Sequence, residues 1–67
     1  MEDLIKKRMV YLYEYMNNND IARETELAKQ LGISVTTLVR FKKGEKIKPL
    51  TLMKIAKVLN VEWADLL

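Results

Sequence analysis

Apolar residues recur along this chain of 67 residues at the three- and four-residue spacing of helices, not in the alternation typical of strands. The dipeptides that form tight hairpin turns are missing as well. Both glycines and the single proline, at Gly32, Gly44 and Pro49, fall between the periodic segments. The pattern therefore predicts an all-α fold of five short helices, in a single domain that spans residues 1–67.

The first half of the chain contains two predicted helices joined by an asparagine-rich turn. The first spans residues 3–16, and its candidate core residues are Leu4, Ile5, Val10, Leu12, Tyr13 and Met16. The asparagines at 17–19 end it, because short polar side chains form local turns that compete with a helix. We expect Asp20 to be the N-cap of the second helix, which ends at Leu31 before a left-handed Gly32. The inward face of this helix comprises Ile21, Leu27, Ala28 and Leu31.

The second half of the chain contains the other three predicted elements. Ser34 is the expected N-cap of a third helix, which ends near Lys43 with Gly44 as the stop. A fourth helix covers residues 51–60, with an inward face of Leu52, Ile55, Ala56 and Leu59. Residues 62–67 suit a short final turn.

Residues 24–43 satisfy the packing demands of a helix-turn-helix. Two short helices that meet at a sharp angle need a small residue where their backbones approach, and Ala28 stands there. The turn needs a residue that tolerates a positive φ, and Gly32 stands there. Aliphatic or aromatic residues fill the remaining inward positions, namely Leu27, Leu31, Ile33, Leu38 and Phe41. A generic helical hairpin explains the apolar spacing but not this agreement at every constrained position.

The segment ETELAKQLGISVTTLVRFKK resembles the helix-turn-helix of phage repressor and Cro-type proteins, the XRE family. The following GEKIKP and LTLMKIAKVLNVEWADLL resemble the loop and the last two helices of that family, so the resemblance covers residues 21–67. It implies a lambda-repressor-like domain of five helices that binds double-stranded operator DNA. It also implies a transcriptional regulator, most simply a repressor, that acts as a homodimer on a palindrome.

The net charge of +3 originates in one short segment. Residues 40–48 contain a single acid, Glu45, and five bases, which are Arg40, Lys42, Lys43, Lys46 and Lys48. Taken alone, such a cluster is either a solvated face or a footprint for the phosphates of a nucleic acid.

Composition excludes several other classes of function. The chain has no cysteine and no histidine, which removes disulfides, thiolate zinc sites and the usual general base. We therefore expect no enzyme activity, cofactor, metal site or small-molecule ligand. No apolar run approaches the ~20 residues of a membrane span. The start, MEDLIKKRM, does not read as a signal peptide, so we expect a cytoplasmic protein.

The resemblance assigns roles to the residues of the third helix and the loop after it. In such a domain the third helix lies in the major groove of the DNA. The expected base contacts are Val35, Thr36, Val39 and Arg40. Arg40 is the strongest candidate, because its planar guanidinium matches the O6 and N7 acceptors of guanine. Val35 and Val39 either contact thymine methyl groups or pack against a neighbouring element. The expected backbone contacts are Ser34, Thr37, Lys43, Lys46 and Lys48.

Three positions depart from the family pattern. Glu24 replaces a glutamine that binds phosphate, so its carboxylate either points away from the DNA or removes that contact. Leu50 stands where some relatives carry an arginine that reaches the minor groove. Lys42 stands where many relatives have a glutamate paired with an arginine of the first helix. One hypothesis is a charge-reversed pair of Lys42 with Glu14; the alternative is that Lys42 faces solvent or a phosphate.

The chain also contains large side chains at its C-terminal end and three tyrosines in the first predicted helix. At the end of the chain, Trp63, Leu66 and Leu67 either close the core or form a dimer interface. The tyrosines at 11, 13 and 15 do not share one helix face, so we expect packing with wet hydroxyls and not an aromatic platform for bases. Glu24, Leu50 and the exposed valines also favour an alternative function on the same fold, a protein-interaction module such as an antitoxin or adaptor.

Overall fold

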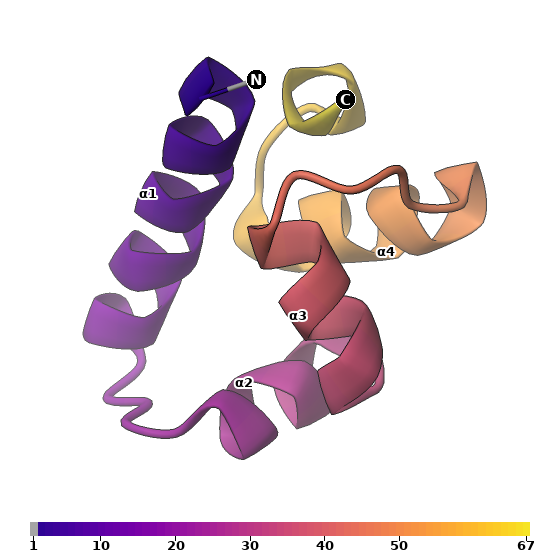
Figure 1. Ribbon diagram of the computed structural model, residues 1–67. Helices are drawn as coiled ribbons and strands as arrows, with labels where there is room; N and C mark the ends of the chain where they lie inside the picture. The colour runs from indigo at the N-terminus through magenta and orange to yellow at the C-terminus, as the bar shows by residue number, and fades with distance from the viewer. Residues whose placement is uncertain (1) are drawn as a thin grey trace.

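The computed structural model describes residues 2–67 and is helical throughout (Figure 1). It contains four α-helices and one 3-10 turn: α1 (Glu2–Asn18), α2 (Glu24–Leu31), α3 (Val35–Lys42), α4 (Pro49–Leu59) and η1 (Trp63–Leu66). No strand occurs among these residues. The all-α expectation of five short helical elements is therefore confirmed. Within the same part of the chain, none of the helices combines the length and apolarity needed to cross a membrane.

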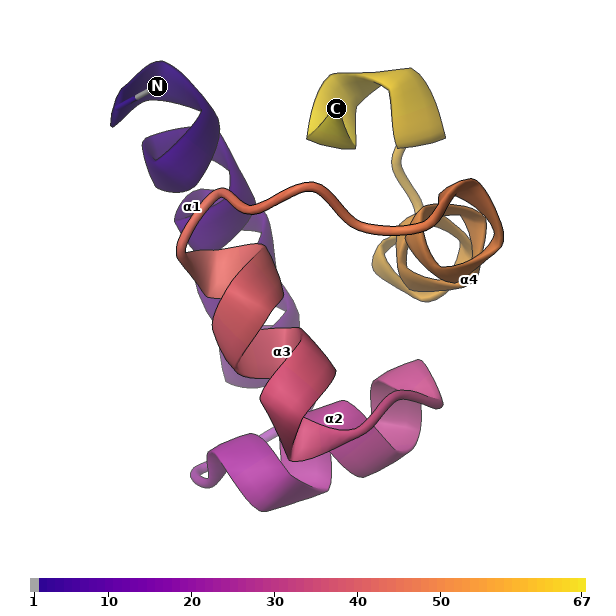
Figure 2. The same ribbon diagram turned by 45° about the vertical axis from the view of Figure 1, so that its right-hand side comes forward.

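The helices surround one small core. α1 stands on one side of the domain and α4 on the other, and α2 crosses the end that lies away from both chain termini (Figures 1 and 2). α1 packs against α3, α4 and η1, while α2 packs against α3 and α4. The 3-10 turn η1 packs on α4 and on α1, so the last residues of the chain close the end opposite α2.

Every described element contributes apolar side chains to the core. The buried set is Leu12, Ile21, Leu27, Ala28, Leu31, Leu38, Phe41, Ile47, Leu52, Ile55, Ala56 and Leu66. It confirms most of the inward faces predicted from helical spacing. Val10 and Tyr13 are exposed, so their assignment to the core was wrong. The physical reason is that α1 buries the face that carries Arg8 and Leu12, whereas Val10 and Tyr13 lie on the other side of the helix.

Several boundaries differ from the predicted ones. α1 continues to Asn18, and the Asn19 side chain and backbone nitrogens then donate to the Tyr15 carbonyl. Asp20 has a φ of 54° and does not cap α2; the N-cap is Arg23, without a side-chain bond. α4 begins at Pro49, two residues earlier than predicted. Proline is accepted at the first helical position because the backbone N–H that it lacks would have no partner within the helix.

The turns on either side of α3 agree with the sequence patterns. Gly32 ends α2 with a φ of 75°, and the Ser34 hydroxyl accepts a hydrogen bond of 3.1 Å from the Thr37 backbone nitrogen. Gly44 follows α3 with a φ of 78°. A Cβ at Gly44 would lie 2.8 Å from Cγ1 of Ile5, so glycine also permits the close approach of α1 to this turn.

Candidate nucleic-acid interface

A buried arginine of α1 fixes the end of α3, and the sequence patterns did not reveal it. Arg8 is 2% exposed, and its guanidinium donates to three backbone carbonyls. Nε and Nη2 donate to the Leu66 carbonyl at 2.9 and 2.6 Å, and Nη1 donates to those of Phe41 and Glu45 at 2.9 and 3.0 Å. Its Cζ also lies 4.5 Å from the centroid of the Phe41 ring.

This arrangement ties together three segments that are distant in sequence. The carbonyls belong to the end of α3, to the loop after it and to η1, and carbonyls at a helix end carry partial negative charge. Burial lowers the pKa of Arg8 from its ordinary value because the charged form loses hydration. The guanidinium stays protonated at neutral pH, since the ordinary pKa of an arginine lies far above neutrality. A signal existed in the sequence: Leu4, Arg8 and Leu12 share one face of a helix.

α3 exposes the residues that were predicted to read bases. Leu38 and Phe41 are buried, whereas Val35, Thr36, Val39 and Arg40 are all exposed. Burial inside the domain therefore does not account for the two valines. β-branched residues are also poor choices for an exposed helix on propensity alone. The exposed face of α3 is thus suited to contact with another molecule.

On one side of α3 lies a basic hollow of about 360 Å³, here called the loop hollow. It is lined by Thr37, Arg40, Lys46, Ile47, Lys48 and Thr51. Its wall carries three cations and two hydroxyls and no carboxylate. The buried side chain of Ile47 anchors the loop, and the two lysines beside it are exposed. Four of the residues predicted to contact DNA therefore lie together in one concavity.

Hydrogen bonds to α1 and α3 fix the backbone of the loop hollow. The Glu45 carbonyl accepts a bond from Arg8, and the Glu45 nitrogen donates to the Arg40 carbonyl at 3.1 Å. Lys48 precedes α4, whose first turn provides Thr51. Within the described part of the chain, no ion pair involves Arg40, Lys46 or Lys48. The three cations of this hollow are therefore positioned by the fold and available to an anion.

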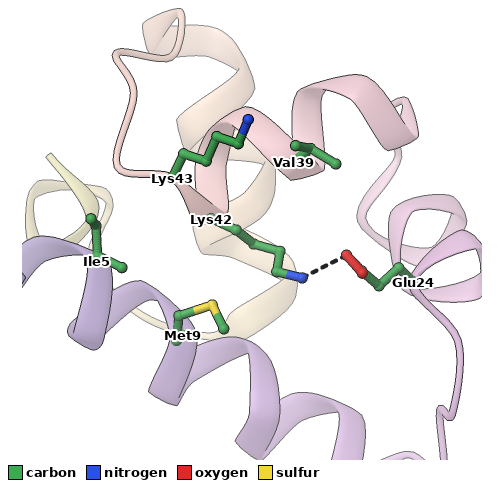
Figure 3. Close-up of a pocket in the computed structure, with 6 residues that line it drawn as sticks. All are labelled: Ile5, Met9, Glu24, Val39, Lys42 and Lys43. Carbon is green, nitrogen blue, oxygen red and sulfur yellow. Dashed lines mark hydrogen bonds and ion pairs between the residues drawn. The ribbon is translucent and has the colours of Figure 1, made fainter.

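On the other side of α3 lies a second hollow of about 370 Å³, here called the α2 hollow (Figure 3). It is lined by Ile5, Met9, Glu24, Val39, Lys42 and Lys43. Lys42 Nζ lies 2.6 Å from Glu24 Oε1, and the two side chains are 26% and 47% exposed. This carboxylate turns toward a lysine of its own chain.

The hypothesis that Lys42 pairs with Glu14 was wrong. Lys42 leaves α3 on the side where α3 packs against α2, and it reaches the first residue of α2. Glu14 lines a different hollow, together with Leu59 and Val61 near the end of α4. The first helix does contain a buried arginine, Arg8, but its partners are backbone carbonyls.

Other predicted site residues lie apart from the two hollows. Ser34 caps α3 at its N-terminal end, where its hydroxyl also donates to Thr37 Oγ1 at 2.9 Å. Leu66 is fully buried and closes the core, so its assignment to a dimer interface needs correction; Trp63 and Leu67 are exposed.

The Tyr15 hydroxyl donates to Gln30 Oε1 at 2.9 Å, and its ring packs on the core as expected. Among the described residues, no cluster of acidic side chains could hold a metal ion.

Short helices in this arrangement, with an exposed α3 between two cationic hollows, define a helix-turn-helix domain of the kind that binds DNA. Comparison with protein-family models supports this conclusion. The chain belongs to the Cro/C1-type helix-turn-helix DNA-binding domain family, whose model matches residues 12–67. Comparisons with curated proteins and with solved structures gave no match. The family covers α2, α3, α4 and η1 completely, and its function is DNA binding in transcription regulation.

Proposed function

We propose that this protein represses transcription by binding a palindromic operator as a homodimer, with α3 of each copy in the major groove. The observation that carries the proposal is the exposed face of α3, flanked by two hollows that each hold at least one cation without an ion pair among residues 2–67. The two phosphate backbones that border a major groove would pass on either side of such a helix. The protein would act in the cytoplasm, and the bound dimer would block polymerase sterically.

Sequence would be read by the exposed face of α3. Arg40 would bind a guanine through two hydrogen bonds, and each good pair of this type discriminates by about 1–3 kcal/mol. Thr36 offers a hydroxyl and a methyl group, and Val35 and Val39 offer methyl groups to thymine. Phosphates would be held by Ser34, Thr37, Lys43, Lys46 and Lys48, which set the register of the helix without reading bases.

A dimer would explain the exposed side chains at the end of the chain. Trp63 and Leu67 lie in and directly after η1 and are exposed, so contact with a second copy would remove them from water. Two copies on a palindrome would place their α3 helices about 34–36 Å apart, one turn of DNA.

The decisive experiment is selection of bound duplexes from a random pool with the full chain. We expect a palindromic motif with half-sites about 10–10.5 base pairs apart. Arg40→Ala should lose the preference at one position of each half-site, while Arg23→Ala, on the turn before α2, should keep it. Recovery of a single half-site would contradict the dimer, and recovery of no motif would contradict operator binding.

One observation favours a second function, a protein-interaction module such as an antitoxin or adaptor. Leu50 is 80% exposed at the start of α4, and the exposed Met53 lies one turn further on the same helix. An aliphatic pair of this kind suits a protein partner better than a phosphate backbone. If the selection recovers no motif, this function becomes the better explanation, and Leu50→Lys should then abolish capture of the partner.

A further inference from the structure

The α2 hollow contains one lysine that is engaged by its own chain and one that is not. Lys42 and Lys43 both line this hollow beside Val39, yet only Lys42 forms an ion pair within the described residues. Figure 3 shows the Lys42 side chain extending toward Glu24, with Met9 below and the Lys43 ammonium pointing elsewhere.

We propose that Glu24 withholds Lys42 from the DNA backbone, and that this contact limits the affinity of the protein for any duplex. The inference rests on the proposed function, because it concerns how the same interface is tuned. With Glu24 paired, the α2 hollow offers a net charge of +1 to a phosphate, from two lysines and one carboxylate. The loop hollow offers +3, from Arg40, Lys46 and Lys48.

The position of Glu24 stabilises this arrangement. Glu24 is the first residue of α2, where the partial positive charge of a helix N-terminus favours a carboxylate. Lys42 is mostly buried, so its stem packs in the hollow that Ile5 and Met9 help to line and its ammonium points to Glu24. A second carboxylate of α2, that of Glu26, accepts instead from Gln30 Nε2 at 3.2 Å. The withholding contact is therefore specific to Glu24.

The consequence is measurable as salt dependence. Each phosphate that a cation neutralises adds about 0.9 to the slope of log affinity against log salt. A lysine that remains paired with a carboxylate releases no counterion. Release of Lys42 should therefore steepen the slope by about 0.9, which multiplies the loss of affinity between 50 and 200 mM salt by about 3.5. The base preference should not change, since Lys42 would reach only the backbone.

The test compares the wild type with Glu24→Ala, Lys42→Ala and the double variant, on a duplex with the selected motif and on a scrambled duplex. Binding is followed by fluorescence anisotropy at several salt concentrations. Glu24→Ala should bind both duplexes more tightly at low salt with the steeper slope, so that its advantage over the wild type grows by about 3.5-fold from 200 to 50 mM salt. The double variant should bind no more tightly than Lys42→Ala and with the same slope. Glu26→Ala removes one acid from the same helix and should leave the slope unchanged.

Three outcomes decide between the alternatives. If the gain from Glu24→Ala persists without Lys42, the carboxylate acts by simple repulsion and the proposal is overturned. If the wild type binds its motif but Glu24→Ala is no tighter, the proposal is overturned while operator binding stands. If no variant binds either duplex although all unfold cooperatively on heating, the proposed function itself fails.

Discussion

The two hollows beside α3 have nearly the same size, about 360 and 370 Å³, but they are built in different ways. The loop hollow is shaped by backbone that Arg8 and Ile47 hold from within the core, and its three cations have no carboxylate neighbour in its wall. The α2 hollow is partly lined by the apolar side chains of Ile5 and Met9, and a partly exposed ion pair cancels part of its charge.

This difference shows that the number of lysines in a segment does not measure its capacity to bind phosphates. Lys42 and Lys48 both belong to the basic segment of residues 40–48. One is paired with Glu24, and the other is exposed beside further cations. Removal of buried supports should therefore damage the loop hollow most, whereas changes to the Glu24–Lys42 pair of the α2 hollow should have small effects on stability.

The largest effect is expected from Arg8→Met. The variant removes the four hydrogen bonds that Arg8 donates to the carbonyls of Phe41, Glu45 and Leu66, of which the Phe41 carbonyl keeps a second donor, the Gly44 nitrogen. A buried polar group left without a partner costs about 1–3 kcal/mol because it stays desolvated, and more than one carbonyl is affected, so the loss of stability should reach several kcal/mol. Urea unfolding followed by circular dichroism measures this change.

Lys7→Met is the matched control for Arg8→Met. Lys7 is the preceding base of α1 and is exposed, so its replacement should alter the free energy of unfolding by no more than about 0.5 kcal/mol. A similar small value for Arg8→Met would show that the carbonyls find other partners and that Arg8 does not support the loop hollow.

Gly44→Ala should have the next largest effect. The residue has a positive φ, and the new Cβ would lie 2.8 Å from Cγ1 of Ile5, which lines the α2 hollow. The left-handed conformation alone costs about 1–2 kcal/mol for a residue with a Cβ. Gly32→Ala is the control, since its φ is similar but its nearest contact, with Lys54, is an ordinary 3.6 Å. Equal losses of stability in the two variants would mean that the contact with Ile5 relaxes without cost.

Lys48→Ala tests the loop hollow through binding. Loss of one phosphate contact should reduce the slope of log affinity against log salt by about 0.9. Lys57→Ala, which removes an exposed base from the last turn of α4, should leave the slope as it is. Anisotropy titrations on the selected duplex measure both. Equal slopes for the two variants would contradict a phosphate contact at Lys48.

The smallest effect is expected for the contribution of the Glu24–Lys42 pair to stability. Both side chains are partly exposed, so solvent screens their attraction, and the coupling energy should stay below about 1 kcal/mol. A double-mutant cycle in urea, with the three variants already described, gives this energy. A coupling of several kcal/mol would place the pair among the structural supports of α3, and the contrast between the two hollows would lose its basis.

The helical elements and the helix-turn-helix follow from local patterns in the sequence. Helical spacing, glycines at the stops and a serine cap act over three or four residues, so a linear pattern predicts them, and the end of α2, Gly32 and α3 agree with it. The exposed face of α3 follows from the same periodicity, because Leu38 and Phe41 fix which side is buried.

The contact partners of individual side chains depend on the tertiary packing. Arg8 lies on an apolar face, but the three carbonyls that compensate its charge come from residues 33 to 58 positions away. The long side chain of Lys42 reaches α2 instead of α1, and Leu66 fills the core instead of an interface. A spacing pattern assigns a residue to a face; which group it meets there depends on how helices far apart in sequence are packed.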